Sequence, residues 1–357
     1  MTDTTEPETA TATETPWVQV QPDIRVEHLG RLIVARAIET RIRRTLDAAR
    51  KARVAYAEPR NVIVSGETGV GKTDIMKRYL RDNAEYRRKD GNLKRPVLYV
   101  DVRNSSTPKA VAKEMLARLG LPEEMHGGST ADISKRVKTH LVGQQVELVI
   151  IDEFHNTLTD NGAVRANRIA EWVKDLCKAK SRSAAMPDGL ADETIPFAMV
   201  GTEKVLRIVD PTLNPELASI TPYRMAVDRY RYRTADEVAE FRLFLDDLDY
   251  ELPFDESSNL HHPDIADKIH IATFGLLRQV SHLVTGAAEL AIETGDDRIY
   301  EHHFYESLEQ QRGILQSNLI SAESQGDERR ALTNPFTPPQ RSFDTKPRRK
   351  RGYQEAA

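Results

Sequence analysis

Short apolar runs alternate with amphipathic stretches through the middle of this chain. The apolar runs have the length of strands, and they lie at 61–64, 96–102, 147–151 and 195–200. Between them, apolar residues recur at helical spacing, at 74–80, 107–119, 129–142 and 163–180. Strands that alternate with helices in this way are typical of a mostly parallel sheet with helices on both faces. The pattern therefore predicts an α/β fold.

The pattern becomes purely helical on both sides of this region. Residues 32–53 predict one helix, whose apolar face consists of Leu32, Ile33, Ala35, Ile38, Ile42 and Leu46. Towards the C-terminus, apolar stripes at helical spacing lie at 235–248, 263–272, 276–293 and 301–315. We therefore expect a helical lead-in at 17–54, a core at 55–233 and a small helical lid at 234–320.

Both ends and one internal stretch have no such pattern. Residues 1–16 are rich in Thr, Ala and Glu and contain no basic residue, which predicts a disordered acidic arm. Residues 321–357 contain several prolines and the basic run Lys346–Arg351, which predicts a flexible basic tail. Such a tail either contacts a partner or nucleic acid, or only aids solubility. Residues 181–194 predict an inserted loop.

A phosphate-binding motif lies between the first predicted strand and the helix that follows it. Its pattern, G-x-x-x-x-G-K-[ST], is met by Gly66, Glu67, Thr68, Gly69, Val70, Gly71, Lys72 and Thr73. Glycines let backbone N–H groups converge on phosphate oxygens, and the start of a helix adds positive potential. Lys72 is predicted to reach the β and γ phosphates and Thr73 to ligate Mg²⁺. The alternative is a glycine-rich turn with a solvated lysine.

A second motif supports the prediction of a nucleotide-binding site. The apolar run at 147–151 ends abruptly at Asp152 and Glu153. Asp152 is predicted to hold Mg²⁺ and Glu153 to polarise the attacking water, since Mg²⁺ needs few protein carboxylates when it also binds water and phosphate. Two acids at a strand end can instead cap a helix. Together with the glycine-rich loop, they predict a site for ATP and Mg²⁺.

Composition narrows the remaining possibilities. No apolar run approaches the ~18 residues that a membrane helix needs, and no secretory signal precedes the fold, so we expect a cytoplasmic protein without a membrane partner. The formal net charge is −4, so any DNA binding must come from local basic surfaces. The single cysteine, Cys177, is predicted to be a buried thiol. The pairs His261–His262 and His302–His303 lack the spacing of a metal site and are predicted to be exposed.

Several segments together resemble a known family. These are the phosphate loop, Asp-Glu-Phe-His-Asn at 152–156, a helix carrying Arg168 and Lys174, and Val-Gly-Thr-Glu at 200–203. Over about residues 20–315 the chain resembles the TniB/TnsC-type AAA+ ATPases of DNA transposition. The resemblance implies a P-loop NTPase AAA+ core with a small C-terminal helical lid. It also implies a homo-oligomer, either ring or helical filament, that assembles on duplex DNA with ATP. Its further partners would be a transposase, which it recruits or activates, and a target-selection protein or complex.

The resemblance also assigns roles to single residues. Thr202 matches the first sensor position, and Arg278 matches the second sensor, with a plain surface arginine as the alternative. His155 and Asn156 follow the acidic pair, where His155 either orients Glu153 or packs in the core.

One position departs from the family pattern. The arginine finger is displaced to Arg224 or Arg229, or it is missing. An arginine finger supplies about 10³-fold or more in rate, so its loss implies slow, regulatory ATP hydrolysis.

The sequence gives the weakest indication of which residues contact DNA. The candidates are Arg103, Lys109, Arg165 and Arg168, and the alternative for each, taken singly, is an ordinary surface charge. Two other classes of function share the same core. One is a helicase loader or replication initiator, and the other is a partner-switching NTPase that acts without DNA.

Overall fold

The computed structural model describes residues 15–55, 58–103, 107–158, 162–177, 194–311 and 334–337. These residues form two compact units, which are described separately. The core unit comprises Ile33–Leu248 and Phe274–Ser281, and the helical unit comprises the chain up to Leu32, Asp249–Thr273 and the chain from His282 onwards. The domain boundaries set out above remain a prediction.

A five-stranded sheet forms the centre of the core unit. Its strands are β1 (Val62–Ser65), β4 (Val97–Asp101), β5 (Leu148–Asp152), β6 (Phe197–Gly201) and β7 (Tyr223–Ala226). They lie in the order β4-β5-β6-β1-β7, and every neighbouring pair is parallel. Because all five run the same way, the segments that follow them meet at one edge of the sheet. The predicted α/β fold with a mostly parallel sheet is confirmed.

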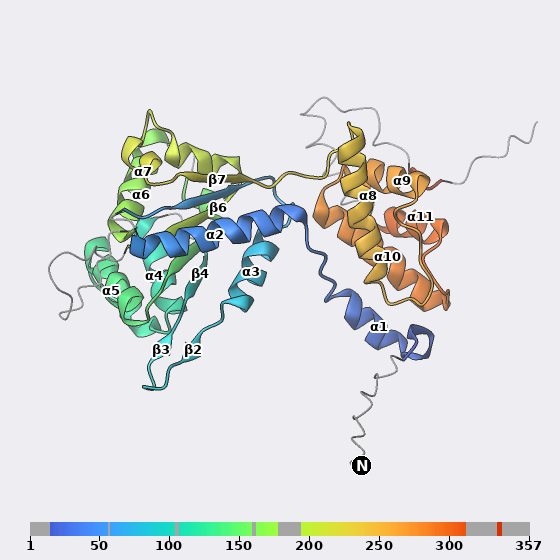
Figure 1. Ribbon diagram of the computed structural model, residues 1–357, viewed down its shortest axis with the longest axis horizontal. Coiled ribbons are helices and arrows are strands. Elements are labelled where there is room, and N and C mark those ends of the chain that lie inside the picture. The colour runs from blue at the N-terminus through green and yellow to red at the C-terminus, as the bar shows by residue number, and fades with distance from the viewer. Residues whose placement is uncertain are drawn as a thin grey trace, which may run out of the picture. The chain divides into compact units, whose positions relative to one another are not determined.

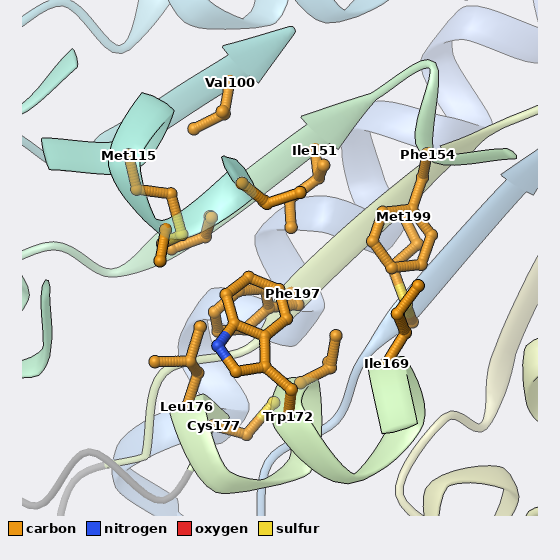
Figure 2. Packing of buried hydrophobic residues seen from close by; sticks show 14 of the residues in the cluster. Val100, Met115, Ile151, Phe154, Ile169, Trp172, Leu176, Cys177, Phe197 and Met199 are labelled. Atoms are coloured by element: carbon orange, nitrogen blue, oxygen red, sulfur yellow. The ribbon is translucent and has the colours of Figure 1, made fainter. Parts of the chain in front are cut away.

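Helices cover both faces of this sheet (Figure 1). One face packs against α2 (Ala37–Ala55) and α3 (Lys72–Asp82), and the other against α4 (Pro108–Arg118), α5 (Thr130–Gly143) and α6 (Gly162–Cys177). Figure 2 shows the second layer, where Trp172 of α6 lies over Phe197 of β6 and Met115 of α4 lies near Ile151 of β5. Burial of this apolar surface on both sides of the sheet is the main stabilising contribution.

The first long helix begins later than its apolar pattern predicted. It starts at Ala37, so residues 32–36 are not helical, and Ile33 is 44% exposed. The buried face consists of Ile42, Leu46, Ala49 and Ala52. The reason lies in Arg36, whose guanidinium donates to the carbonyl oxygens of Val70 and Asp228 at 3.1 and 2.9 Å. These tertiary contacts hold the preceding segment outside the helix.

Several short elements were not predicted. A two-stranded hairpin, β2 (Tyr86–Arg87) with β3 (Leu93–Lys94), precedes β4 and turns through Gly91 at φ 82°. Short helices also occur, at η2 (Pro122–Met125), η3 (Phe154–Thr157), η4 (Glu203–Val209) and α7 (Pro215–Ser219). They are too short to show a periodic pattern in the sequence. Two of them, η3 and η4, directly follow β5 and β6.

The helical stretches of the C-terminal half are confirmed with small shifts at their ends. They are α8 (Ala235–Tyr250), α9 (Pro263–Thr273), α10 (Leu277–Thr294) and α11 (Glu301–Gln310). The helical unit also contains η1 (Trp17–Gln19) and α1 (Pro22–Leu29), which lie in the predicted helical lead-in but were not predicted as separate elements. α10 and α11 cross closely at Gly286, where an added Cβ would lie 2.6 Å from Ser307 Oγ.

Other predictions have mixed outcomes. The acidic arm, except its last two residues, and the inserted loop, except Thr194, lie outside the described residues, as does the basic tail apart from 334–337. Cys177 is buried as predicted, and burial raises the pKa of its thiol to about 12. Among the helices that the structure describes, none has the length and apolar character to cross a membrane.

Candidate nucleotide-binding site

The loop between β1 and α3 has a geometry that depends on its glycines. Gly69 and Gly71 adopt φ angles of 87° and 91°, the left-handed region that residues with a Cβ rarely adopt. At Gly66 the requirement for glycine is steric, because an added Cβ would lie 2.2 Å from the carbonyl oxygen of Val227. The Gly66 N–H also donates to the carbonyl oxygen of Gly201 at the end of β6, at 3.1 Å. The loop is therefore held between β6 and the segment that follows β7.

Lys72 points back into this loop. Its Nζ donates to the carbonyl oxygens of Gly66 and Glu67 at 2.8 and 2.7 Å, and the residue is only 6% exposed. Burial lowers the pKa of Lys72, while the carboxylates of Glu153 and Asp152 act in the opposite direction. A largely desolvated ammonium beside backbone N–H groups at the start of a helix favours an anion such as phosphate.

Asp152 and Thr73 lie together beneath the loop. The Thr73 hydroxyl donates to Asp152 Oδ2 at 2.7 Å, and the Glu153 backbone N–H donates to Oδ1 at 2.8 Å. The Tyr99 hydroxyl donates to the same Oδ2 at 2.8 Å, and burial together with Asp152 raises the pKa of that phenol. One carboxylate beside one hydroxyl fits Mg²⁺, which takes its remaining ligands from water and phosphate. Sequence reasoning missed Tyr99, since a tyrosine inside a strand carries no motif.

Glu153 and His155 form a second polar group at the end of β5. Glu153 has φ 56°, an uncommon angle for a residue with a side chain. Its Oε2 lies 3.4 Å from His155 Nδ1, and the backbone N–H of Thr202 donates to the same Nδ1 at 3.4 Å. An added Cβ at Gly201 would lie 2.9 Å from that nitrogen. His155 therefore lies between the acidic pair at 152–153 and Thr202, the predicted first sensor.

The protonation state of His155 decides which of these two neighbours it can bind. Burial lowers its pKa, and the cations of Lys72 and Lys204 act in the same direction against the pull of Glu153. Near pH 7 the ring is thus neutral, and Nδ1 can accept the Thr202 N–H. A proton on Nδ1 would remove that acceptor and supply a donor towards Glu153.

This arrangement leads to a pH-dependent expectation. As the pH falls through the lowered pKa of His155, we expect ATP turnover to decrease, because protonated His155 holds the carboxylate of Glu153. His155→Asn retains an acceptor near the Nδ1 position but takes up no proton, so its pH profile should lack this acid limb. Turnover measured between pH 5 and 8 for both proteins tests this, and identical acid limbs would contradict it.

Thr202 and Asn156 have less definite positions. The Thr202 hydroxyl is buried without a hydrogen-bond partner among the described residues, so it is available to a group that enters the site. The backbone N–H of Asn156 donates to the carbonyl oxygen of Glu153 at 3.0 Å and closes the η3 turn. The first-sensor role of Thr202 remains a prediction.

Arg278 lies beside the phosphate loop. Its backbone N–H donates to the carbonyl oxygen of Gly69 at 2.9 Å, and a Cβ added at Gly69 would lie 3.2 Å from the Arg278 Cβ. The next residue towards the N-terminus, Leu277, comes within 2.7 Å of a Cβ added at Gly71. Arg278 is itself exposed and electrostatically lowers the pKa of Lys72. Its role as second sensor remains a prediction, and the structure places it within reach of the loop.

The two arginine-finger candidates differ in their surroundings. Arg224 is in the middle of β7, opposite Ile63, and donates to the carbonyl oxygen of Val209 at 3.1 Å. Arg229 lies beyond the end of β7, and its Nε donates to Glu67 of the phosphate loop of its own chain at 3.0 Å. Arg229 is therefore committed to the loop in this structure. Which arginine acts as the finger, if any, remains a prediction.

Arg36 is a neighbour of the site that the sequence did not reveal. It is 8% exposed, and its guanidinium carbon lies 4.3 Å from the centre of the Tyr230 ring. Since it also donates to Val70 of the loop, it connects the loop, the segment after β7 and the start of α2. In the sequence, the only signal that could have identified Arg36 is its position directly before the helix.

The proposed DNA contacts are not gathered into one group by any described contact. Arg103 is 65% exposed and pairs with Asp101, to which its Nε donates at 2.8 Å. Lys109 donates to the carbonyl oxygen of a loop residue at 2.9 Å. Arg168 is exposed on α6, and the side chain of Arg165 lies outside the described residues. Their contacts with DNA remain a prediction.

A cluster in the helical unit offers ligand types suited to a metal. One atom each of Asp296, His302 and His303 lies within 4.8 Å of the others. His303 Nδ1, however, accepts the backbone N–H of Tyr300 at 3.0 Å, so the proton of the neutral ring is on Nε2, which lies 3.0 Å from Asp296 Oδ2. The ring thus fixes the start of α11. The prediction of exposure is wrong for His303, which is fully buried, and correct for His302.

The fold and the site define the class of protein. A parallel sheet in the order β4-β5-β6-β1-β7, with a phosphate loop after β1 and an acidic pair after β5, is that of a P-loop AAA+ ATPase. The chain belongs to the bacterial TniB protein family, whose model matches residues 24–217, more than half of the chain. The resemblance seen in the sequence is thereby confirmed.

One curated protein is similar to part of this chain. ORC1-type DNA replication protein 1 of Sulfolobus acidocaldarius is 31% identical over 124 residues, which make up 34% of this chain and 30% of that protein. The match therefore spans less than a third of the curated relative.

Two solved structures have a similar fold. The Aeropyrum pernix ORC1 protein in complex with DNA has a TM-score of 0.53 and 17% identity, covering 81% of this chain and 69% of that one. Cdc6p of Pyrobaculum aerophilum has a TM-score of 0.53 and 18% identity, covering 79% and 69%. At these identities the likeness shows the fold.

Proposed function

We propose that this protein is an ATP-dependent regulator of DNA transposition. In this proposal it binds ATP with Mg²⁺, assembles as a ring or filament on target duplex DNA, and recruits or activates a transposase. A target-selection protein or complex would direct it. The observation that carries the proposal is the match to the TniB family over a chain whose Thr73 and Asp152 meet beneath a phosphate loop.

The site residues would act as follows. Lys72 would exchange the carbonyl oxygens of its own loop for phosphate oxygens, and Thr73 with Asp152 would hold Mg²⁺. When bound, the ion neutralises charge on the β and γ phosphates. Glu153 would orient and deprotonate the attacking water, with His155 setting its position. Since Arg229 pairs with Glu67 in its own chain, slow turnover is the expected behaviour of an isolated subunit.

The DNA part of the proposal has separate support. One solved structure of similar fold is described as a complex with DNA. The net charge of −4 gives no overall attraction, so exposed arginines such as Arg103 and Arg168 would supply local contacts. Contacts limited to phosphates would make binding independent of sequence and sensitive to salt.

Lys72→Ala tests the dependence of DNA binding on nucleotide. Loss of a charge-assisted contact to phosphate should lower ATP affinity about 10- to 100-fold and remove ATP-dependent binding to random duplex DNA. The measurement is fluorescence anisotropy with ATP, ADP or no nucleotide. Lys77→Ala is the matched control, because Lys77 is exposed on the same helix. Tight, ATP-dependent binding that is lost only in Lys72→Ala supports the proposal.

Two results would favour a different class of function. Nucleotide binding without ATP-dependent DNA affinity at any salt concentration would favour a partner-switching NTPase. The similarity to an ORC1-type protein keeps a replication initiator or helicase loader as a second candidate. A binding assay with a replicative helicase in place of a transposase separates that candidate from the first.

A further inference from the structure

A short segment of the C-terminal tail packs on the helical unit. Of the residues beyond 311, the structure describes only 334–337. Phe336 is 2% exposed and stacks on Phe304 of α11, with ring centroids 5.0 Å apart and planes inclined by 19°. Phe304 is itself 1% exposed. An aromatic side chain from a stretch without apolar periodicity is thus as buried as a core residue.

Polar contacts fix the same segment to α11. The side-chain amide of Asn334 donates to the carbonyl oxygen of Tyr305 and to Glu309 Oε1, each at 3.1 Å. In addition, Lys268 of α9 places its ammonium 5.9 Å from the Phe336 centroid. The aromatic ring and the amide therefore engage α11 at separate points, which fixes both position and direction.

The segment is also arranged to bind with little loss of freedom. Asn334 Oδ1 accepts the Phe336 N–H at 3.0 Å, and the Asn334 carbonyl oxygen accepts the Thr337 N–H at 3.0 Å. This closes a turn with Pro335 at its second position, where the ring of proline fixes φ in advance. A turn that is already formed loses less conformational entropy when it docks.

We propose that Asn334–Thr337 is an anchor that docks the C-terminal tail on α9 and α11 of its own chain. The surface it occupies is a binding site for an aromatic residue presented in an asparagine-proline turn. The anchor reduces the stretch of sequence between the helical unit and the cationic run Lys346–Arg351 from residues 312–345 to residues 338–345. This last step rests on the function proposed above: tethering raises the local concentration of the run near bound DNA and so strengthens binding.

Hydrogen exchange tests the docking without any DNA. Phe336→Ala should increase the exchange of the α11 amides on the order of tenfold relative to the unaltered protein, because the packing partner of Phe304 is lost. A chain that ends at residue 333 should give the same increase. Thr337→Ala is the matched control, since among the described residues that hydroxyl bonds only within the turn. Unchanged α11 exchange in Phe336→Ala would overturn the anchor.

A second measurement tests the consequence for DNA. With ATP, Phe336→Ala should bind random duplex several-fold more weakly, and replacing the five basic residues of 346–351 with Gln should have at least the same effect. Equal DNA affinity of Phe336→Ala and the unaltered protein, with α11 exchange increased, would overturn the role in DNA binding and leave the docking supported. Absence of any ATP-dependent DNA binding in the unaltered protein would instead contradict the proposed function, which the exchange experiment does not depend on.

Discussion

Glu153→Gln is expected to lower ATP turnover about 10²- to 10³-fold while ATP affinity stays within a few-fold of its original value. The reason is that Gln keeps the size and the hydrogen-bonding reach of Glu but cannot accept a proton from the attacking water. Glu153 directly follows Asp152, which remains bonded to Thr73 in the variant. Binding and hydrolysis should therefore separate. Phosphate release gives the turnover, and equilibrium titration with ATP gives the affinity.

The control for this prediction is Glu203→Gln. Glu203 is an exposed acid in the first turn of η4, close in sequence to Thr202, and it makes no described contact with the loop. Turnover of that variant should be close to that of the unaltered protein. If Glu153→Gln kept most of its turnover, another group would have to activate the water, and the mechanism described above would be wrong. Under the proposed function, Glu153→Gln should also remain on DNA longer than the unaltered protein.

Gly66→Ala is expected to have the second largest effect. The new methyl group would lie 2.2 Å from the carbonyl oxygen of Val227, a distance at which the backbone itself must move. Overpacking of this kind typically costs about 1–3 kcal/mol in the free energy of unfolding. Since the Gly66 carbonyl oxygen also accepts a hydrogen bond from Lys72, displacement of the loop should abolish measurable ATP binding as well.

Gly143→Ala is the matched control for this substitution. Gly143 is the last residue of α5, and an added Cβ there meets nothing within 4 Å. Alanine in a helix is favoured over glycine by about 0.5–1 kcal/mol, so stability should be equal or slightly higher and ATP binding should not change. Thermal unfolding and ATP titration of both variants provide the comparison. Normal ATP binding by Gly66→Ala would show that the loop tolerates a shift away from β7.

The parts of the fold that were predicted from the sequence are those with local causes. The phosphate loop, the strand before it and the helix after it follow from adjacent residues. β5 and β6 are apolar runs buried on both faces, and β4 is a mostly apolar run. β7 was missed because it is only four residues long and partly exposed: Tyr223 is half-buried and Arg224 is exposed. A strand of this length without a continuous apolar run is too short to show a periodic pattern in the sequence.

Side chains that act across the fold were harder to find. Tyr99 reaches Asp152 only because β4 and β5 are neighbours, and Arg36 reaches Asp228 across most of the core sequence. Neither residue belongs to a motif. Their partners are set by strand order and helix packing, which periodicity in one sequence does not specify.

The hydrogen bond from the Gly66 N–H to the carbonyl oxygen of Gly201 has a consequence for timing. It joins the loop that would receive the phosphates to the end of β6, where His155 and Thr202 meet. Binding of phosphate to the loop and the position of the group that is predicted to activate the water are therefore linked through this one backbone hydrogen bond. Under the proposed function, in which hydrolysis ends the stay of a subunit on DNA, small changes in the packing around Gly201 would therefore change the lifetime of the assembly.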